Sequence, residues 1–332
     1  MKRLIGRSGE LPTEGHFPSL EGATAWLNSP PLDAETLRGK VVVVDFCTYT
    51  CINWLRSLPY VRAWAQAYED RGLVVIGVHT PEFPFEHDLE NVRRALTGME
   101  VTYPVAVDNA YAVWDAFANH YWPALYFIDA EGRIRHHRFG EGDYERSEII
   151  IKQLLRDAGS KDVSEELAPV DPRGPEVAAD WDNLESPEEY LGSRRAQNFE
   201  PSERSGWGEH RSDEGARPLR RNHWTLAGNW TMTPEAVVLD EPNGRIAFRF
   251  HARDVHLVMG PVARETPVPF RVSIDHQPPG PSGGGDVDEH GAGLLDEQRM
   301  YQLIRQAGPI DDRTFEIEFL DRGAEAFAFT FG

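Results

Sequence analysis

Two cysteines lie close together in a setting that suits thiol chemistry. Cys47 and Cys51 are the only cysteines among the 332 residues of the chain. An unbroken apolar run, residues 41–44, precedes them, and an amphipathic segment, residues 54–68, follows them. A buried strand that leads through a loop into a helix places Cys51 at or beside the helix N-terminus, where unpaired backbone N–H groups favour an anion. A thiolate is such an anion, and a lowered thiol pKa makes a cysteine reactive.

Three kinds of chemistry fit these two residues. In the first, Cys47 and Cys51 form a redox couple, which a tight loop would permit because a disulfide needs Cα atoms within about 7 Å. In the second, Cys51 works alone: it takes up glutathione or a partner thiol, or it reduces a peroxide through a sulfenic acid. Thr48, three residues before Cys51, resembles part of the peroxiredoxin motif. In the third, the site is a binding groove without turnover. The structural alternative is that both cysteines are small buried hydrophobic residues.

Asp45 interrupts the apolar run just before Cys47. A carboxyl group inside a buried strand is unfavourable unless it stays neutral or finds a partner. The pattern therefore favours a proton-transfer group behind the nucleophile, with a pKa raised by burial. The alternative is a carboxylate that caps the loop after the strand.

The segments around this site alternate between strands and helices. Continuous β-branched runs indicate central strands, and apolar residues at helical spacing indicate amphipathic helices. A hairpin and a final helix close the region. The sequence predicts strands at residues 41–46, 73–79, 103–107, 124–129 and 133–139, and helices at residues 52–68, 86–96, 109–117 and 147–157.

This order and motif resemble the thioredoxin-fold redoxin and TlpA-like proteins, and most closely the soluble C-terminal region of DipZ-type cytochrome c biogenesis proteins. Those proteins typically read Val-Asp-Phe-Trp, three more residues, then Cys-x-x-Cys. On that pattern, Asp45 matches the buried family aspartate and Cys51 matches the nucleophile. Pro59 matches the proline that kinks the active-site helix, and Trp122-Pro123 resembles the segment that carries the family's cis-proline.

Two positions depart from the family pattern. Trp54 stands where the resolving cysteine is expected, and Cys47 stands where the family has a tryptophan at the strand end. A dithiol reductase needs a second thiol that attacks the mixed disulfide, so Cys47 is the possible resolving thiol. The predicted catalytic residues are Cys51, Cys47 and Asp45. The predicted substrate-binding residues are Thr48, Thr50, Asn53, Trp54, Trp122 and Pro123, and we expect neither a cofactor nor a metal ion.

The resemblance implies an α/β thioredoxin fold followed by an all-β sandwich. We expect a thioredoxin-like domain over residues 1–157 and a linker rich in charged residues, Pro and Gly over residues 158–194. The remaining residues, 195–332, contain many short alternating runs separated by turns, which predicts an antiparallel β-sandwich. DipZ-like proteins carry a jelly-roll of carbohydrate-binding-module type in this place.

The second domain offers weaker candidate sites. The loop at residues 283–290 clusters oxygen-bearing side chains that could hold Ca²⁺, although a solvated loop is the simpler interpretation. Three tryptophans, Trp207, Trp224 and Trp230, could stack on a sugar, although such residues more often belong to a core.

The composition limits the partners of the chain. A formal net charge of -20 should repel nucleic acid and anionic membranes, and two cysteines exclude a disulfide scaffold. The expected partner is a protein that carries a thiol or disulfide, or a small-molecule thiol. The second domain could also supply a dimer or carbohydrate contact. The basic residues 1–9 precede no apolar signal core, which predicts a cytoplasmic protein, or a periplasmic or extracellular one if the chain has been trimmed.

Overall fold

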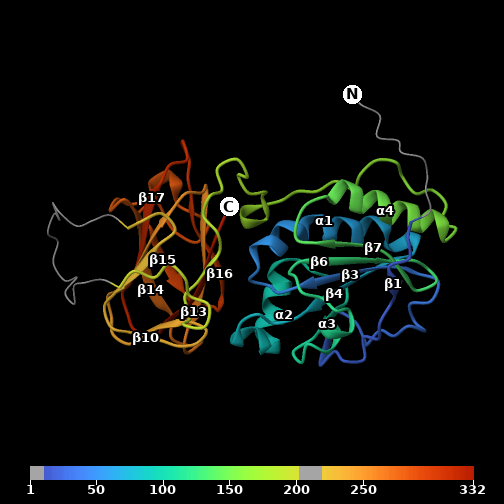
Figure 1. Ribbon diagram of the computed structural model, residues 1–332, viewed down its shortest axis with the longest axis horizontal. Coiled ribbons are helices and arrows are strands. Elements are labelled where there is room, and N and C mark those ends of the chain that lie inside the picture. Colours follow the sequence, from blue (N-terminus) through green and yellow to red (C-terminus); the bar gives the residue numbers. More distant parts are fainter. Residues whose placement is uncertain (1–10, 202–218) are drawn as a thin grey trace. The chain divides into compact units, whose positions relative to one another are not determined.

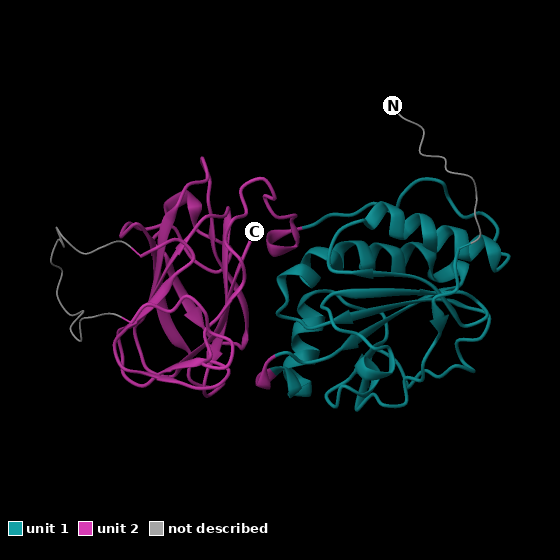
Figure 2. Cartoon of the chain, viewed as in Figure 1, with its two compact units in different colours: residues 1–82, 86–172 teal, residues 83–85, 173–332 magenta. Residues whose placement is uncertain are grey.

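The computed structural model describes residues 11–201 and 219–332. These residues form two compact units, which Figure 2 shows in different colours. Unit 1 comprises Met1–Glu82 and Glu86–Pro172, and unit 2 comprises Phe83–Phe85 and Arg173–Gly332.

Unit 1 is built on a mixed seven-stranded sheet in the order β1-β7-β6-β3-β4-β5-β2 (Figure 1). Its central strand β3 is buried along its whole length, as expected for a strand covered on both faces. It pairs in parallel with β4 and antiparallel with β6. The strands are β1 Gly15–His16, β2 Ala25–Leu27, β3 Val41–Cys47, β4 Leu73–His79, β5 Val105–Val107, β6 Ala124–Ile128 and β7 Arg133–Phe139.

Alternate residues of β3 point to opposite faces of the sheet. Val42, Val44 and Phe46 pack with residues of α3 in one apolar cluster, whereas Asp45 lies on the other face and contacts α1. Figure 1 shows α1 and α4 side by side along the sheet, and a hydrogen bond between their side chains joins them. The helices are α1 Ile52–Tyr68, α2 Leu89–Gly98, α3 Ala112–Ala116 and α4 Tyr144–Asp157, with 3-10 turns η1 Glu69–Arg71 and η2 Pro84–His87.

Two predicted helices begin later than the sequence indicates, and an aspartate explains each difference. The carboxylate of Asp88 accepts hydrogen bonds from the backbone N–H groups of Glu90 and Asn91, so α2 starts at Leu89 rather than at residue 86. The carboxylate of Asp108 accepts from Val113 N and Trp114 N, which satisfies the first N–H groups of α3. Asp88 does this from the N-cap of α2, and Asp108 does it from three residues before the N-cap of α3, Tyr111.

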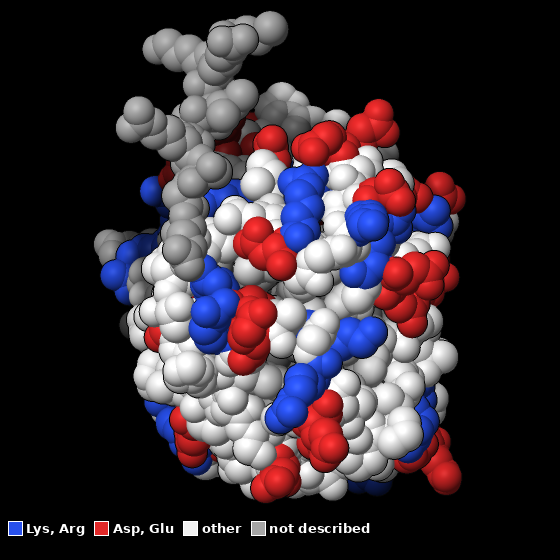
Figure 3. All heavy atoms as spheres, turned by 90° about the vertical axis from the view of Figure 1, so that its right-hand side faces the viewer, with Lys and Arg blue, Asp and Glu red and all other residues white. Residues whose placement is uncertain are grey.

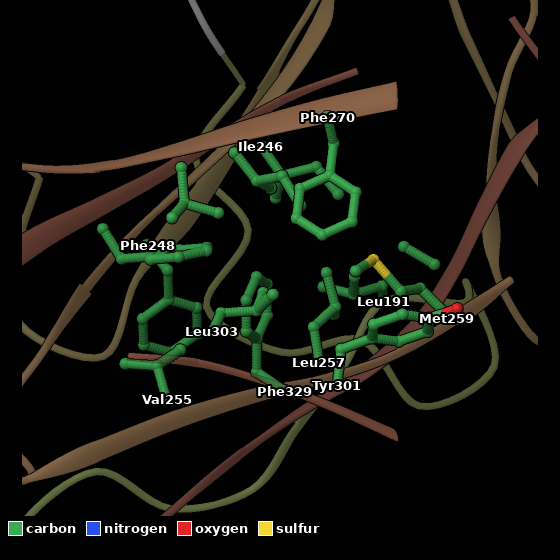
Figure 4. Packing of buried hydrophobic residues seen from close by; sticks show 14 of the residues in the cluster. Leu191, Ile246, Phe248, Val255, Leu257, Met259, Phe270, Tyr301, Leu303 and Phe329 are labelled. Atoms are coloured by element: carbon green, nitrogen blue, oxygen red, sulfur yellow. The ribbon is translucent and has the colours of Figure 1, made fainter. Parts of the chain in front are cut away.

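Unit 2 consists of two antiparallel sheets, as the alternating runs predict. One sheet has the order β10-β11-β18-β13-β16 with β8 paired to β18, and the other has the order β15-β14-β17-β12-β9. Inward-facing residues of both sheets share one apolar core, including Phe248, Leu257, Phe270 and Phe329 (Figure 4). The strands are β8 Glu189–Tyr190, β9 Trp224–Ala227, β10 Trp230–Met232, β11 Val237–Leu239, β12 Gly244–Phe250, β13 Asp254–Pro261, β14 Val268–Ile274, β15 Ala292–Leu295, β16 Arg299–Arg305, β17 Arg313–Phe319 and β18 Ala324–Phe331, with 3-10 turns η3 Gly174–Glu176 and η4 Gly280–Ser282.

Part of the expected linker is structured in unit 2. Residues 173–194 include η3 and β8, and Leu191 is fully buried in the core of this unit. Residues 83–85 also belong to unit 2, where Phe83 and Phe85 pack against the ring of Phe327. These buried contacts between aromatic rings stabilise unit 2.

Acidic and basic side chains alternate on the face of the molecule that Figure 3 draws. Among the described residues, none of the helices combines the length and the apolar character that crossing a bilayer requires.

Candidate active site

Cys51 occupies the N-cap of α1. A tight turn leads into it, because the backbone N–H of Cys51 donates to the carbonyl of Thr48 at 3.2 Å. The residue is partly exposed, and its Sγ lies 3.9 Å from the carbonyl oxygen of Trp122. The predicted position at the mouth of a helix is therefore present, where the backbone N–H groups of the first turn point toward the N-cap residue.

The peptide bond between Trp122 and Pro123 is cis. Pro123 is buried directly before β6, and Trp122 is partly exposed with its ring 4.3 Å from that of Trp114. Because the Trp122 carbonyl contacts Cys51 Sγ, the structure brings together two segments that lie far apart in the sequence.

Asp45 lies beneath this surface with no exposed area. Its Oδ2 accepts a hydrogen bond from the indole Nε1 of Trp54 at 2.9 Å, whereas its Oδ1 has no hydrogen-bond partner among the described residues. Burial raises the pKa of Asp45 to about 7, against the opposing effects of the Trp54 N–H and the neighbouring Tyr103. The carboxyl group can therefore exchange a proton near neutral pH.

Trp54 is fully buried on the helix side of the sheet. The sequence places it among the substrate-binding residues, but its ring offers no surface to a substrate. Instead, its N–H holds the buried carboxyl group of Asp45 in place. A cysteine at this position could not make that long-range contact.

Cys47 ends β3 and is 1% exposed. Burial raises the pKa of its thiol well above the ordinary value, and the negative charges of Asp45, Glu86 and Cys51 raise it further. Cys47 and Asp45 are two positions apart on one strand, so their side chains point to the same face of the sheet. Both cysteines are free thiols in the structure.

His79 is the residue paired with Cys47 across the parallel ladder of β3 and β4. It is fully buried, and neither ring nitrogen has a hydrogen-bond partner among the described residues. Burial lowers the pKa of His79 to about 3, so the imidazole is neutral. Its ring stacks on that of Tyr49 at a centroid distance of 5.7 Å. This stacking supports the active-site loop from its buried side.

A second buried carboxylate, that of Glu86, contacts the active-site loop. Glu86 is fully buried, and its Oε1 accepts from the Thr50 hydroxyl at 2.6 Å while its Oε2 accepts from the Glu82 N–H. Thr50 and Thr48 are both buried, so they shape the loop from within, whereas Asn53 is exposed beside Cys51. The predicted catalytic and substrate-binding residues include neither Glu86 nor His79, because their contacts depend on the register of β4 and the course of the following loop.

The weaker candidates of the second domain have other roles. Trp224 is fully buried in the core of unit 2, and the partly buried Trp230 packs against that core, so both rings contribute to core packing. Trp207 lies outside the described residues. In the predicted calcium loop, Asp286 forms an ion pair with Arg299 at 2.7 Å and Asp288 accepts from nearby backbone N–H groups. Residues 11–201 and 219–332 contain no group of three or more His, Cys, Asp or Glu side chains placed to hold a metal ion.

Known proteins share both parts of this chain. Residues 17–137 match the AhpC/TSA family and residues 186–332 match the thioredoxin like C-terminal domain. Protein DipZ of Mycobacterium tuberculosis is 40% identical over 264 residues, which cover 76% of this chain and 36% of that protein. The chain is a DipZ homologue. It therefore combines a thioredoxin-like domain of the AhpC/TSA family with the thioredoxin-like C-terminal domain.

Further relatives of this DipZ homologue match its first part. The thiol-disulfide oxidoreductase YkuV of Bacillus subtilis is 29% identical over 139 residues, which cover 42% of this chain and 93% of that protein. NHL repeat-containing protein 2 of Homo sapiens is 34% identical over 142 residues, which cover 42% of this chain and 20% of that protein. Homologues of the chain thus include thiol-disulfide oxidoreductases, and the chain spans about a third of the length of the DipZ protein that it matches.

Proposed function

We propose that the protein is a thiol-disulfide oxidoreductase whose redox couple is Cys47 and Cys51. The observation that carries the proposal is the partly exposed Sγ of Cys51 at the N-terminus of α1, 3.9 Å from the Trp122 carbonyl beside Pro123. This arrangement presents the Cys51 sulfur to an incoming disulfide, beside the segment that contains the cis peptide bond.

In the first step, the Cys51 thiolate attacks one sulfur of a partner disulfide. A bond forms between Cys51 Sγ and that sulfur, the partner's S–S bond breaks, and the second sulfur leaves as a thiolate. Asn53 is exposed and Trp122 is partly exposed beside Cys51, so we assign both to contact with the partner.

In the second step, Cys47 resolves the mixed disulfide. Its thiol passes a proton to the Asp45 carboxylate, which lies on the same face of β3 and has a pKa near 7. The resulting Cys47 thiolate attacks Cys51 Sγ, the bond between Cys51 Sγ and the attached partner sulfur breaks, and that sulfur leaves as a thiolate. The partner disulfide gains two electrons and the protein dithiol loses two, leaving a disulfide between Cys47 and Cys51.

The cycle closes when a reduced thiol, either a small-molecule thiol or a protein dithiol, attacks the Cys47–Cys51 disulfide and returns two electrons. Trp54 has a positioning role in this scheme. It occupies the site of the usual resolving residue and holds Asp45 through its N–H, so that the base stays within the interior beside Cys47.

The test is mass spectrometry of protein treated with a disulfide such as oxidised glutathione. The unchanged protein should lose two hydrogens through an internal disulfide, whereas Cys47→Ser should accumulate glutathione on Cys51. Thr97→Ser, at an exposed position of α2, is the control, because it leaves the active-site loop and both thiols in place. If the unchanged protein accumulates the Cys51–glutathione adduct as Cys47→Ser does, Cys47 is not the resolving thiol.

The burial of Cys47 favours a second candidate, in which Cys51 exchanges with glutathione alone. The 1% exposure of Cys47 and its raised pKa both slow attack by that thiol. In that case Cys47→Ser should turn over a glutathione mixed disulfide as fast as the unchanged protein. Exposure to hydrogen peroxide separates the peroxidase variant of this chemistry, since it requires a sulfenic acid on Cys51.

A further inference from the structure

Unit 2 contains a pocket of about 420 Å³ whose lining includes two arginines, Arg253 and Arg305. All of its lining residues belong to residues 173–332. Arg253 directly precedes β13 and Arg305 ends β16, and these strands are neighbours in one antiparallel sheet. The pocket therefore lies at one end of this strand pair.

A buried carboxylate fixes both guanidinium groups. Asp254 is 1% exposed, and its Oδ2 accepts from Nε and Nη2 of Arg253 at 2.9 and 2.7 Å. Its Oδ1 accepts from Nε of Arg305 at 2.7 Å. The Nη2 atoms also donate to backbone carbonyls, Arg253 to Ala178 and Arg305 to Gly174. The two planar groups thus have defined positions before any ligand arrives, which lowers the entropy lost on binding.

Each arginine keeps one donor group for a ligand. Nη1 of Arg253 and Nη1 of Arg305 form no hydrogen bond with residues 11–201 or 219–332, and both side chains are partly exposed, at 23% and 31%. Two guanidinium groups and one carboxylate leave a single positive charge in the cluster. This charge balances a monoanion with two acceptor oxygens, which is the form of a carboxylate.

The pocket also offers a polar acceptor and an apolar wall. Gln306 donates from Nε2 to the carbonyl of Ala252 at 2.7 Å, which orients its amide and leaves Oε1 without a donor from the described residues. Val177, Pro281 and Ala307 supply apolar surface. We propose that this pocket binds a small organic acid that carries both a carboxylate and a hydroxyl group, with the carboxylate on the two arginines and the hydroxyl on Gln306.

Isothermal titration of the full chain tests the proposal with two sources of this chemistry, D-glucuronate for a sugar acid and L-lactate for a simple hydroxy acid. D-glucose lacks the carboxylate, acetate lacks the hydroxyl, and inorganic phosphate has a different shape and charge. At least one of the two hydroxy acids should bind at least ten-fold more tightly than glucose, acetate and phosphate. Equal binding of phosphate, or binding of neither hydroxy acid, would overturn the proposal.

Two variants locate the binding. Arg305→Gln removes one donor, and Ala307→Phe fills the pocket from an exposed position while leaving Asp254 and both arginines in place. Each should weaken hydroxy-acid binding at least ten-fold. Arg313→Gln is the matched control, because Arg313 also pairs with an aspartate in unit 2 but does not line the pocket. Undiminished binding to folded Ala307→Phe would place the ligand elsewhere and refute the assignment.

Discussion

Near each end of helix α1, a tryptophan N–H donates to a buried carboxyl group, but the two carboxyl groups differ in their other hydrogen-bond partners. At the C-terminal end, Glu148 of α4 accepts from Trp64 Nε1, Tyr68 Oη and Ala168 N, and it pairs with Lys152 at 3.1 Å. At the N-terminal end, Asp45 accepts from the indole of Trp54 on one oxygen only.

This difference is what we expect between a structural carboxylate, Glu148, and the reactive one that we propose, Asp45. Glu148 has a full set of donors and a nearby cation, as buried charges in stable interiors usually do. Asp45 lacks both, and burial raises its pKa to about 7. His79 and Thr48 also keep unpaired buried polar atoms next to Cys47. Unpaired groups concentrated in this way are typical of functional sites.

Removing the charge of Glu148 should produce the largest loss of stability. In Glu148→Gln, the buried ammonium of Lys152 loses its ion-pair partner, and breaking such a pair typically destabilises a protein by about 3–5 kcal/mol. The measurement is urea unfolding followed by the helical circular dichroism signal, because the four α-helices of the described residues lie in unit 1. The conservative change Glu90→Gln, at an exposed position of α2, should leave the transition unchanged. Equal transitions for the two variants would contradict a structural role for Glu148.

The sequence predicts the elements around this site better than the contacts between them. The bounds of α1 and the course of β3 follow from local periodicity, and the resemblance indicates Pro123, Cys51 and Asp45. The contact between Trp54 and Asp45 could not be predicted, because a tryptophan at the resolving position suggests loss of a thiol and not a new partner for the carboxyl group.

The rest of the candidate site depends on contacts across the chain. His79 meets Cys47 only through the register of β3 with β4, and Glu86 meets Thr50 only through the path of the loop after β4.

In unit 2, β15 includes Gly293 and lacks a clear alternation of apolar and polar residues. Its pairing with β14 therefore has no local signal.

Above neutral pH, Asp45→Asn should stabilise the folded protein, by an amount similar to the loss of stability expected for Glu148→Gln. The pKa of Asp45 rises from its ordinary value of 3.8 to about 7 on folding. Below pH 3.8 the group is protonated in both states and contributes nothing. Between these two values the unfolded chain releases the proton that the folded protein keeps, so stability falls with rising pH, by about 4 kcal/mol in total.

Above pH 7 this loss is complete in the unchanged protein and absent in Asp45→Asn. Unfolding experiments across this pH range should therefore show a declining free energy for the unchanged protein and a flatter profile for the variant. Asp129→Asn is a useful contrast, since ion-paired Arg135 and Arg133 hold the pKa of that carboxyl below its usual range. Parallel profiles for Asp45→Asn and the unchanged protein would mean that Asp45 does not titrate in this window.

The smallest changes in stability are expected from replacing the two tryptophans of α1, Trp54 and Trp64, which allows a direct comparison of its two ends. Trp54→Phe and Trp64→Phe each remove one N–H donor from the same helix and retain an aromatic ring in a fully buried position. At a pH of about 8, where Asp45 is ionised, Trp54→Phe leaves that carboxylate without its donor and should destabilise unit 1 by about 1–3 kcal/mol. Trp64→Phe leaves Glu148 with its bonds to Tyr68, Ala168 and Lys152, so its effect should be about 1 kcal/mol or less.

The pH dependence distinguishes the two changes further. Losing the Trp54 N–H removes a group that favours the charged form of Asp45, so the decline in stability should extend to higher pH in Trp54→Phe and keep its position in Trp64→Phe. The midpoint of this decline can be measured by urea unfolding at a series of pH values. A shift of equal size in both variants would show that the two carboxyl groups respond alike, and the distinction between a reactive and a structural end of α1 would not hold.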